Sequence, residues 1–81
     1  MDNQQKRDLI LKACNYNAYA RDMASCNHLY MGSMAIALLY VDLGGNWPNE
    51  PLEQVVAQAT TEQLDEGLYR CANIIKHGKL L

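Results

Sequence analysis

The uncharged stretch Met34-Ala35-Ile36-Ala37-Leu38-Leu39-Tyr40-Val41, with Gly44-Gly45 close behind it, decides how this chain folds. It predicts a helix over residues 28–43 that is hydrophobic on almost every side. Other helices usually surround a helix of this kind, so we expect it at the centre of the molecule. Gly44 suits the left-handed conformation that ends many helices.

The residues before this segment predict a first helix over residues 3–26. Asp2 or Asn3 can cap its start, because their side-chain oxygens accept hydrogen bonds from unpaired backbone N–H groups. Its apolar face repeats at steps of three and four residues and comprises Leu9, Ala13, Tyr16, Ala20 and Met23. The side chains of Ser25 and Asn27 compete for backbone hydrogen bonds, so we expect a break there, with one continuous long helix as the alternative.

Two more helices are expected beyond the loop of residues 46–49. Pro51 suits the first position of a short helix. The apolar residues of that helix have helical spacing and are Leu52, Val55, Val56 and Ala59. Thr60 and Gln63 form a capping-box pattern, which starts the last helix near Thr61. The apolar stripe of the last helix comprises Leu64, Leu68, Cys71 and Ile75.

The end of the last helix carries Lys76 and His77 in its final turn and Gly78 just beyond it, the order expected at a helix C-terminus. No segment of useful length alternates with period two, so strands are not expected. The sequence therefore predicts an all-α fold, a small bundle of three long helices plus one short helix. We expect residues 1–81 to form a single helical domain around the apolar second helix.

Composition and charge exclude several classes of protein. Hydrophobic residues make up 49% of the chain and charged residues 20%, which is not the composition of a disordered protein. The net charge of −2 is not that of a basic nucleic-acid binder. Eight continuously apolar residues are too few to cross a membrane, which takes about 20. The polar residues 1–8 lack the apolar segment of a signal peptide, so we expect a cytoplasmic protein with Cys14, Cys26 and Cys71 reduced.

No catalytic residue, metal site or cofactor is predicted. Cys26 and His28 lie close together, but the paired spacing of structural zinc ligands is missing. Gly44-Gly45 does not match the glycine pattern of a phosphate-binding loop. Asp65 and Glu66 are adjacent and point to different sides of a helix, so they do not form an acid–base couple. We therefore expect a protein that is not an enzyme.

The two C-terminal helices invite comparison with a helix-turn-helix DNA reader. Their charges argue against direct nucleic-acid binding, because residues 49–66 hold five carboxylates and no Lys or Arg. Such a surface would repel a phosphate backbone. A nucleic-acid binder remains an alternative if it uses basic residues outside the pair, namely Lys6, Arg7, Lys12 and Arg21.

The same carboxylates predict a face that docks onto a basic surface of a protein partner. They are Glu50, Glu53, Glu62, Asp65 and Glu66. The alternative interpretation is that they are solvated acids at helix N-termini, where a carboxylate is favourable beside the helix dipole.

Two aromatic residues extend this predicted binding face. Tyr19 lies off the main apolar stripe and is a candidate for exposure at an interface. Trp47 lies in the loop, where it is either a lid on the core, which we favour, or an anchor that inserts into a partner.

The leading hypothesis is a non-enzymatic protein-binding module, a small acidic regulator or inhibitor that occupies a partner's basic surface. Small acidic inhibitors of nucleic-acid machinery from phages and mobile elements are comparable by class alone. A further alternative is a purely structural module that self-associates, for example as a homodimer, through small residues of the second segment. Those residues are Gly32, Ser33, Ala35 and Ala37.

Overall fold

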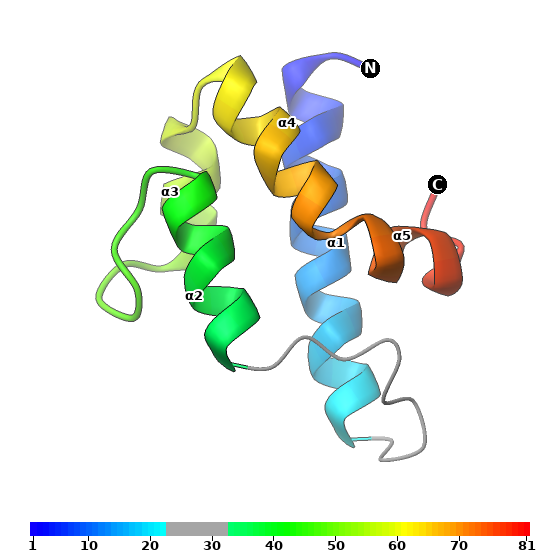
Figure 1. The fold of residues 1–81 in the computed structure, drawn as a ribbon. Coiled ribbons are helices and arrows are strands. Elements are labelled where there is room, and N and C mark those ends of the chain that lie inside the picture. Colours follow the sequence, from blue (N-terminus) through cyan, green and yellow to red (C-terminus); the bar gives the residue numbers. More distant parts are fainter. Residues whose placement is uncertain (23–32) are drawn as a thin grey trace.

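The computed structural model describes residues 1–22 and 33–81, with side chains described for residues 1–16 and 34–81. The helices are α1 (Asn3–Asp22), α2 (Ser33–Asp42), α3 (Leu52–Gln58), α4 (Thr61–Arg70) and α5 (Ala72–Gly78). No strand occurs in the described residues. The prediction of an all-helical fold is confirmed, with five described helices instead of four (Figure 1).

α1 holds the fold together, because it contacts α3, α4 and α5, while α2 packs against α4. In Figure 1, α4 crosses in front of α1, and α2 lies to the left of α1. The buried apolar core comprises Leu9, Ile10, Ala13, Leu39, Tyr40, Leu43, Val55, Val56, Ala59, Leu64, Cys71, Ile74 and Ile75. The apolar stripes predicted for the third and last helices thus face the core, with Leu52 and Leu68 partly buried at its edge. Of the first stripe, Ala20 and Met23 lie outside the described side chains.

The prediction that the second helix lies at the centre is wrong. α2 buries Leu39 and Leu43, but Met34, Leu38 and Val41 are 75%, 39% and 69% exposed. Because α1 takes the central place, α2 is left with one covered side. The apolar run therefore marks an edge helix with an uncovered face.

The predicted last helix is divided at Cys71, whose φ of −87° and ψ of 1° separate α4 from α5. Neither proline nor glycine occupies the break, so no local signal announces it. Both halves pack against α1. The change of direction allows Leu64 on α4 and Ile74 and Ile75 on α5 all to be buried.

The prediction that Gly78 lies just beyond the last helix is also wrong. Gly78 is the last residue of α5, and Lys79 takes the left-handed position with a φ of 53°. The N–H groups of Lys79 and Leu80 donate to the carbonyl oxygens of Lys76 and Ile75, at 3.4 and 3.1 Å. These bonds close the helix as a Schellman motif, one residue later than predicted.

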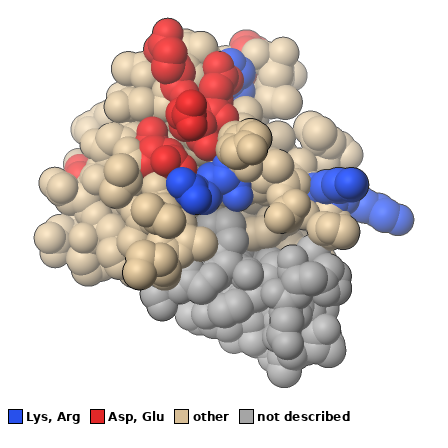
Figure 2. Space-filling model, viewed as in Figure 1, with Lys and Arg blue, Asp and Glu red and all other residues tan. Residues whose placement is uncertain are grey.

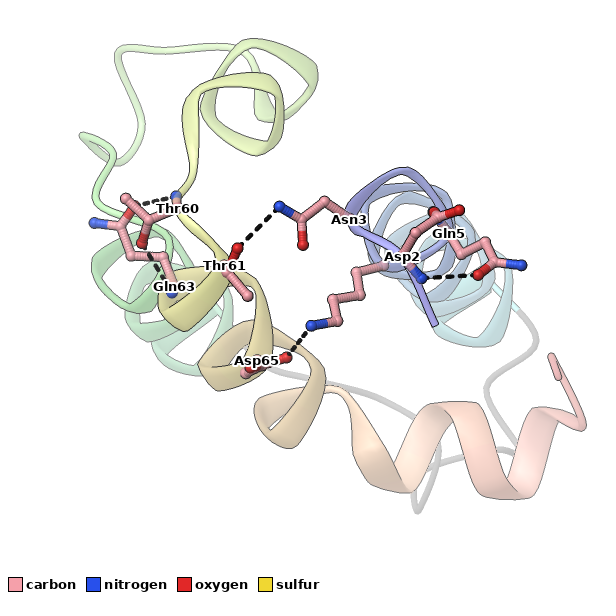
Figure 3. Close-up of polar contacts among 8 residues, drawn as sticks. Asp2, Asn3, Gln5, Thr60, Thr61, Gln63 and Asp65 are labelled. Carbon is pink, nitrogen blue, oxygen red and sulfur yellow. Dashed lines mark hydrogen bonds and ion pairs between the residues drawn. The ribbon is translucent and has the colours of Figure 1, made fainter.

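Three predicted helix ends are confirmed. Gly44, with a φ of 80°, ends α2. The Thr60 hydroxyl accepts from the Gln63 N–H, and the Gln63 side chain accepts from the Thr60 N–H, which completes the capping box. Asp2 caps α1 by accepting from the Gln5 N–H at 2.8 Å (Figure 3).

The break predicted near Ser25 and Asn27 lies outside the described residues. On either side of it, α1 and α2 are two separate helices with different axes (Figure 1). In the part of the chain that is described, no helix has both the length and the apolar character needed to cross a membrane.

Candidate protein-binding face

The five predicted acids do not form one equivalent set. Glu50 lies in the loop between α2 and α3, Glu53 lies on α3, and Glu62, Asp65 and Glu66 lie on α4. Figure 2 shows acidic side chains gathered over α4, with basic side chains along the edge of the patch and to its right. The interactions of each acid decide whether it remains available to a partner.

Glu50 has a structural role in the loop that joins α2 to α3. Its carboxylate accepts from the backbone N–H of Asn46 at 2.9 Å and from the Gln54 side-chain amide at 3.3 Å. Its backbone carbonyl accepts from the Tyr40 hydroxyl at 3.0 Å. Since both parts of Glu50 hold the loop together, this residue leaves the predicted docking set.

Asp65 is bound within the molecule as well. Its carboxylate lies 2.7 Å from the Lys6 Nζ, which ties α4 to α1. The Asn3 side-chain amide donates to the Thr61 hydroxyl at 2.9 Å, one turn earlier on α4 (Figure 3). Asp65 therefore helps to position α4, and its charge is already matched by a lysine.

Glu62 and Glu66 are the acids of α4 that remain available. They are four residues apart, so they lie on the same side of the helix, and both are exposed. Among the described residues, neither accepts a hydrogen bond nor forms an ion pair, and the same holds for exposed Glu53 on α3. The predicted acidic face is thus reduced to Glu53, Glu62 and Glu66.

Arg70, four residues after Glu66 on α4, is bound to another carboxylate. Arg70 Nε donates to Asp42 Oδ2 at 2.9 Å, which joins the C-terminal end of α4 to the end of α2. This hydrogen bond is the main cause that raises the pKa of the Arg70 guanidinium, and the charge of Glu66 contributes in the same direction. The charge of Glu66 acts on the Arg70 guanidinium, but the ion pair of that guanidinium is with the Asp42 carboxylate.

The part of the chain that contains Glu62 and Glu66 carries acidic residues and no Lys or Arg. Residues 33–69 contain no Lys or Arg, and their six carboxylates belong to Asp42, Glu50, Glu53, Glu62, Asp65 and Glu66. The only cations that pair with them in the described structure are Lys6 and Arg70. The surface formed by α2, α3 and α4 is therefore acidic without lysines or arginines of its own.

Apolar residues on the exposed side of α2 were not predicted to belong to the site. Met34, Leu38 and Val41 follow one another at i, i+4 and i+7 and form a stripe on one side of the helix. Tyr69 on α4 is 83% exposed. The sequence does not separate these three residues from the buried ones, because every residue from Met34 to Val41 is apolar. The structure separates them, since Leu39 and Leu43 are buried.

The structure tests the prediction for Trp47 and does not test the prediction for Tyr19. Trp47 packs edge-on against Tyr40, with ring centroids 5.2 Å apart, and remains 45% exposed. It therefore covers a core tyrosine, as a lid would, while one side of the indole stays in contact with solvent. The side chain of Tyr19 lies outside the described side chains.

Two of the three cysteines meet in the core. Cys14 on α1 and Cys71 between α4 and α5 are free thiols joined by a hydrogen bond. This bond and burial raise the pKa of Cys71. The bond also lowers the pKa of Cys14, against the effect of burial. Within the described residues, no three or more His, Cys, Asp or Glu side chains are grouped to hold a metal ion.

An open groove of about 290 Å³ lies between the start of α1 and the last residues of the chain. Its apolar lining includes Leu9, Leu80 and Leu81, and Asp8 and Lys12 also border it. No cysteine or histidine lines the groove. It offers apolar contact bordered by one carboxylate and one ammonium group.

Comparison of this chain with protein-family models, with curated proteins and with solved structures finds no match.

Proposed function

We propose that this chain is a non-enzymatic protein-binding module, a small regulator or inhibitor that occupies a basic surface of a partner protein. The observation that carries the proposal is the pair Glu62 and Glu66, exposed on one side of α4 without an ion pair. Opposite charges on two surfaces speed their encounter and help to select the partner. A basic groove that normally holds nucleic acid is one surface of this kind.

The arrangement of α1 gives less support to nucleic-acid binding. Lys6 is engaged with Asp65, and the Arg7 Nε is buried without a hydrogen-bond partner. Lys12 is exposed, and the Arg21 side chain lies outside the described side chains. A salt titration with duplex DNA tests this alternative, because phosphate contacts give binding that weakens steeply as salt rises.

Self-association is a second candidate, and the exposed stripe Met34, Leu38 and Val41 favours it. An apolar patch on a small protein is commonly an interaction site. Sedimentation at micromolar concentration tests this candidate, because a module that functions by self-association sediments as a dimer or larger species.

Affinity capture from the native host tests the leading proposal. We compare the wild type with Glu62→Gln/Glu66→Gln and with the control Asn15→Lys/Asn73→Lys. Both variants change the net charge by +2, but the control places the change on exposed residues of α1 and α5. We expect a protein partner that the wild type and the control retain and that the glutamine variant loses. Equal capture by all three proteins would contradict the proposal.

A further inference from the structure

The exposed side of α2 offers apolar contact over about two helical turns. Met34 and Val41 are seven residues apart, which corresponds to about 10 Å along a helix. Leu38 lies between them on the same side, while Leu39 and Leu43 point into the core. This spacing of exposed apolar residues is the one through which a helix contacts a second helix.

The acids of α4 lie beside this stripe. α2 packs directly against α4, and the Arg70–Asp42 ion pair joins the two helices at the surface. α2 and α4 are both at the front of Figure 1, and the acidic patch of Figure 2 is seen from the same side. The stripe and the pair Glu62 and Glu66 therefore belong to neighbouring helices that an ion pair joins at the surface.

Charge distinguishes between two occupants of this face. A second copy of the chain would bring another surface of α2 and α4 against the first, as in a two-fold dimer. Because Glu62 and Glu66 have no ion pair among the described residues, two such surfaces would bring like charges together, which disfavours this pairing. A partner with lysines or arginines beside its own apolar residues can contact the apolar stripe of α2 and place its cations against Glu62 and Glu66.

We propose that α2 and α4 together bind one amphipathic helix of a partner protein. Its apolar side contacts Met34, Leu38 and Val41, and its basic residues face Glu62 and Glu66. This inference rests on the proposed function and deepens it, because it adds an apolar contact surface and a helical form to the basic partner.

Synthetic peptides of about 14 residues, or four helical turns, test this inference with the full chain. The first peptide has leucines on one side of the helix and lysines on the other. The second keeps the lysines and replaces each leucine by serine, and the third keeps the leucines and replaces each lysine by glutamate. Binding is followed by NMR through the backbone amides and the methyl groups of Met34, Leu38 and Val41.

We expect the leucine–lysine peptide to bind at least about tenfold more tightly than the serine–lysine peptide, the effect of about 1.4 kcal/mol from apolar contact. Its binding should shift the three methyl resonances and the amides of Glu62 and Glu66. The leucine–glutamate peptide should not bind.

A double substitution tests the apolar half of the face by itself. Met34→Gln/Val41→Thr keeps similar side-chain shapes and removes apolar contact, so it should weaken binding of the leucine–lysine peptide about tenfold. Leu81→Gln is the control, because it changes another exposed apolar residue far along the chain. It should bind as the wild type does.

The possible failures are distinguishable. Equal affinity for the leucine–lysine and serine–lysine peptides, without methyl shifts, would overturn the inference and leave the proposed function standing. Absence of binding by both lysine peptides would overturn the proposed function as well. A dimer of the chain that Met34→Gln/Val41→Thr dissociates would overturn the inference and assign the stripe to a second copy.

Discussion

Lys79 holds the left-handed conformation that ends α5, with a φ of 53°. A residue with a Cβ is disfavoured in this region by roughly 1 kcal/mol, whereas glycine adopts it freely. We predict that Lys79→Gly raises the free energy of unfolding by about 0.5–1 kcal/mol, measured by urea titration. Lys76→Gly, inside α5, should lower the free energy of unfolding by about 1 kcal/mol. Stabilisation by both changes or by neither would contradict the left-handed conformation of Lys79.

The capping box at the start of α4 depends on one hydroxyl group. Thr60 Oγ1 accepts from the Gln63 N–H at 3.2 Å, and the Gln63 Oε1 accepts from the Thr60 N–H at 2.8 Å. Thr60→Ala should lower the free energy of unfolding by about 1 kcal/mol, and Thr60→Ser should restore most of it. The same loss in both variants would show that the hydroxyl does not act as the cap.

The Cys14–Cys71 contact gives stability a pH dependence in the alkaline range. The pKa of Cys71 is raised above its ordinary value of 9.0, first by its hydrogen bond with Cys14 and then by burial. The folded state therefore retains the Cys71 proton at pH values where the unfolded chain loses it. This contribution is complete below about pH 9 and is lost as the pH rises further.

We predict that, under reducing conditions, the free energy of unfolding falls more steeply above pH 9 in the wild type than in Cys14→Ala/Cys71→Ala, which removes both thiols of the pair. Urea titrations at a series of pH values measure both slopes, and the comparison cancels the contributions that the two proteins share. Identical slopes would contradict the raised pKa of Cys71.

Among the elements, α4 approaches α1 and α2 closely at Gly67. A Cβ at this position would lie 2.8 Å from Leu43 Cδ2 and 3.2 Å from Ile10 Cδ1, and both of those side chains are buried. Crowding of this kind costs about 1–3 kcal/mol, against a gain of about 1 kcal/mol from better helix propensity.

Gly67→Ala should therefore lower the free energy of unfolding by about 1 kcal/mol, measured by denaturant titration. Glu66→Ala, one residue earlier on the exposed side, should change it by less than about 0.5 kcal/mol. A stabilised Gly67→Ala variant would contradict the close packing of α4 on α1 and α2.

Helix type and most helix ends could be predicted from the sequence, because their signals are local. Thr60 and Gln63 are three residues apart, and Gly44 lies two residues after the end of α2. The division at Cys71 could not be predicted, because it depends on the packing of both α4 and α5 against α1. The edge position of α2 was missed because a continuous apolar run does not show how many helices are available to cover it.

The acidic character of the candidate face could be predicted from the sequence. Which of its acids have a partner within the molecule could be predicted only in part. The acids of α4 were identified from charge alone, and Glu62 and Glu66 proved to be exposed without ion pairs. The contacts that engage Asp65 and Glu50 within the molecule could not be predicted, because Lys6 is 59 positions from Asp65 and Glu50 holds a loop. Contacts of this kind depend on how the chain folds back on itself.

At the scale of the whole molecule, charge is divided between two parts of the chain. Residues 33–69 supply six carboxylates without a Lys or Arg, and all seven Lys and Arg residues lie outside that range. The ion pairs Lys6–Asp65 and Arg70–Asp42 link the two parts and neutralise two of the acids. The acidic excess that remains on α3 and α4 is the property that the proposed function uses.

The most direct test of this account compares two variants of equal net charge in binding the leucine–lysine peptide. At about 50 mM salt, Glu62→Gln/Glu66→Gln should bind about fivefold more weakly than Asn15→Lys/Asn73→Lys, and the difference should shrink at about 0.5 M salt, where exposed charges are screened. Equal affinities of the two variants at low salt would show that only net charge matters, and would contradict a binding face on α4.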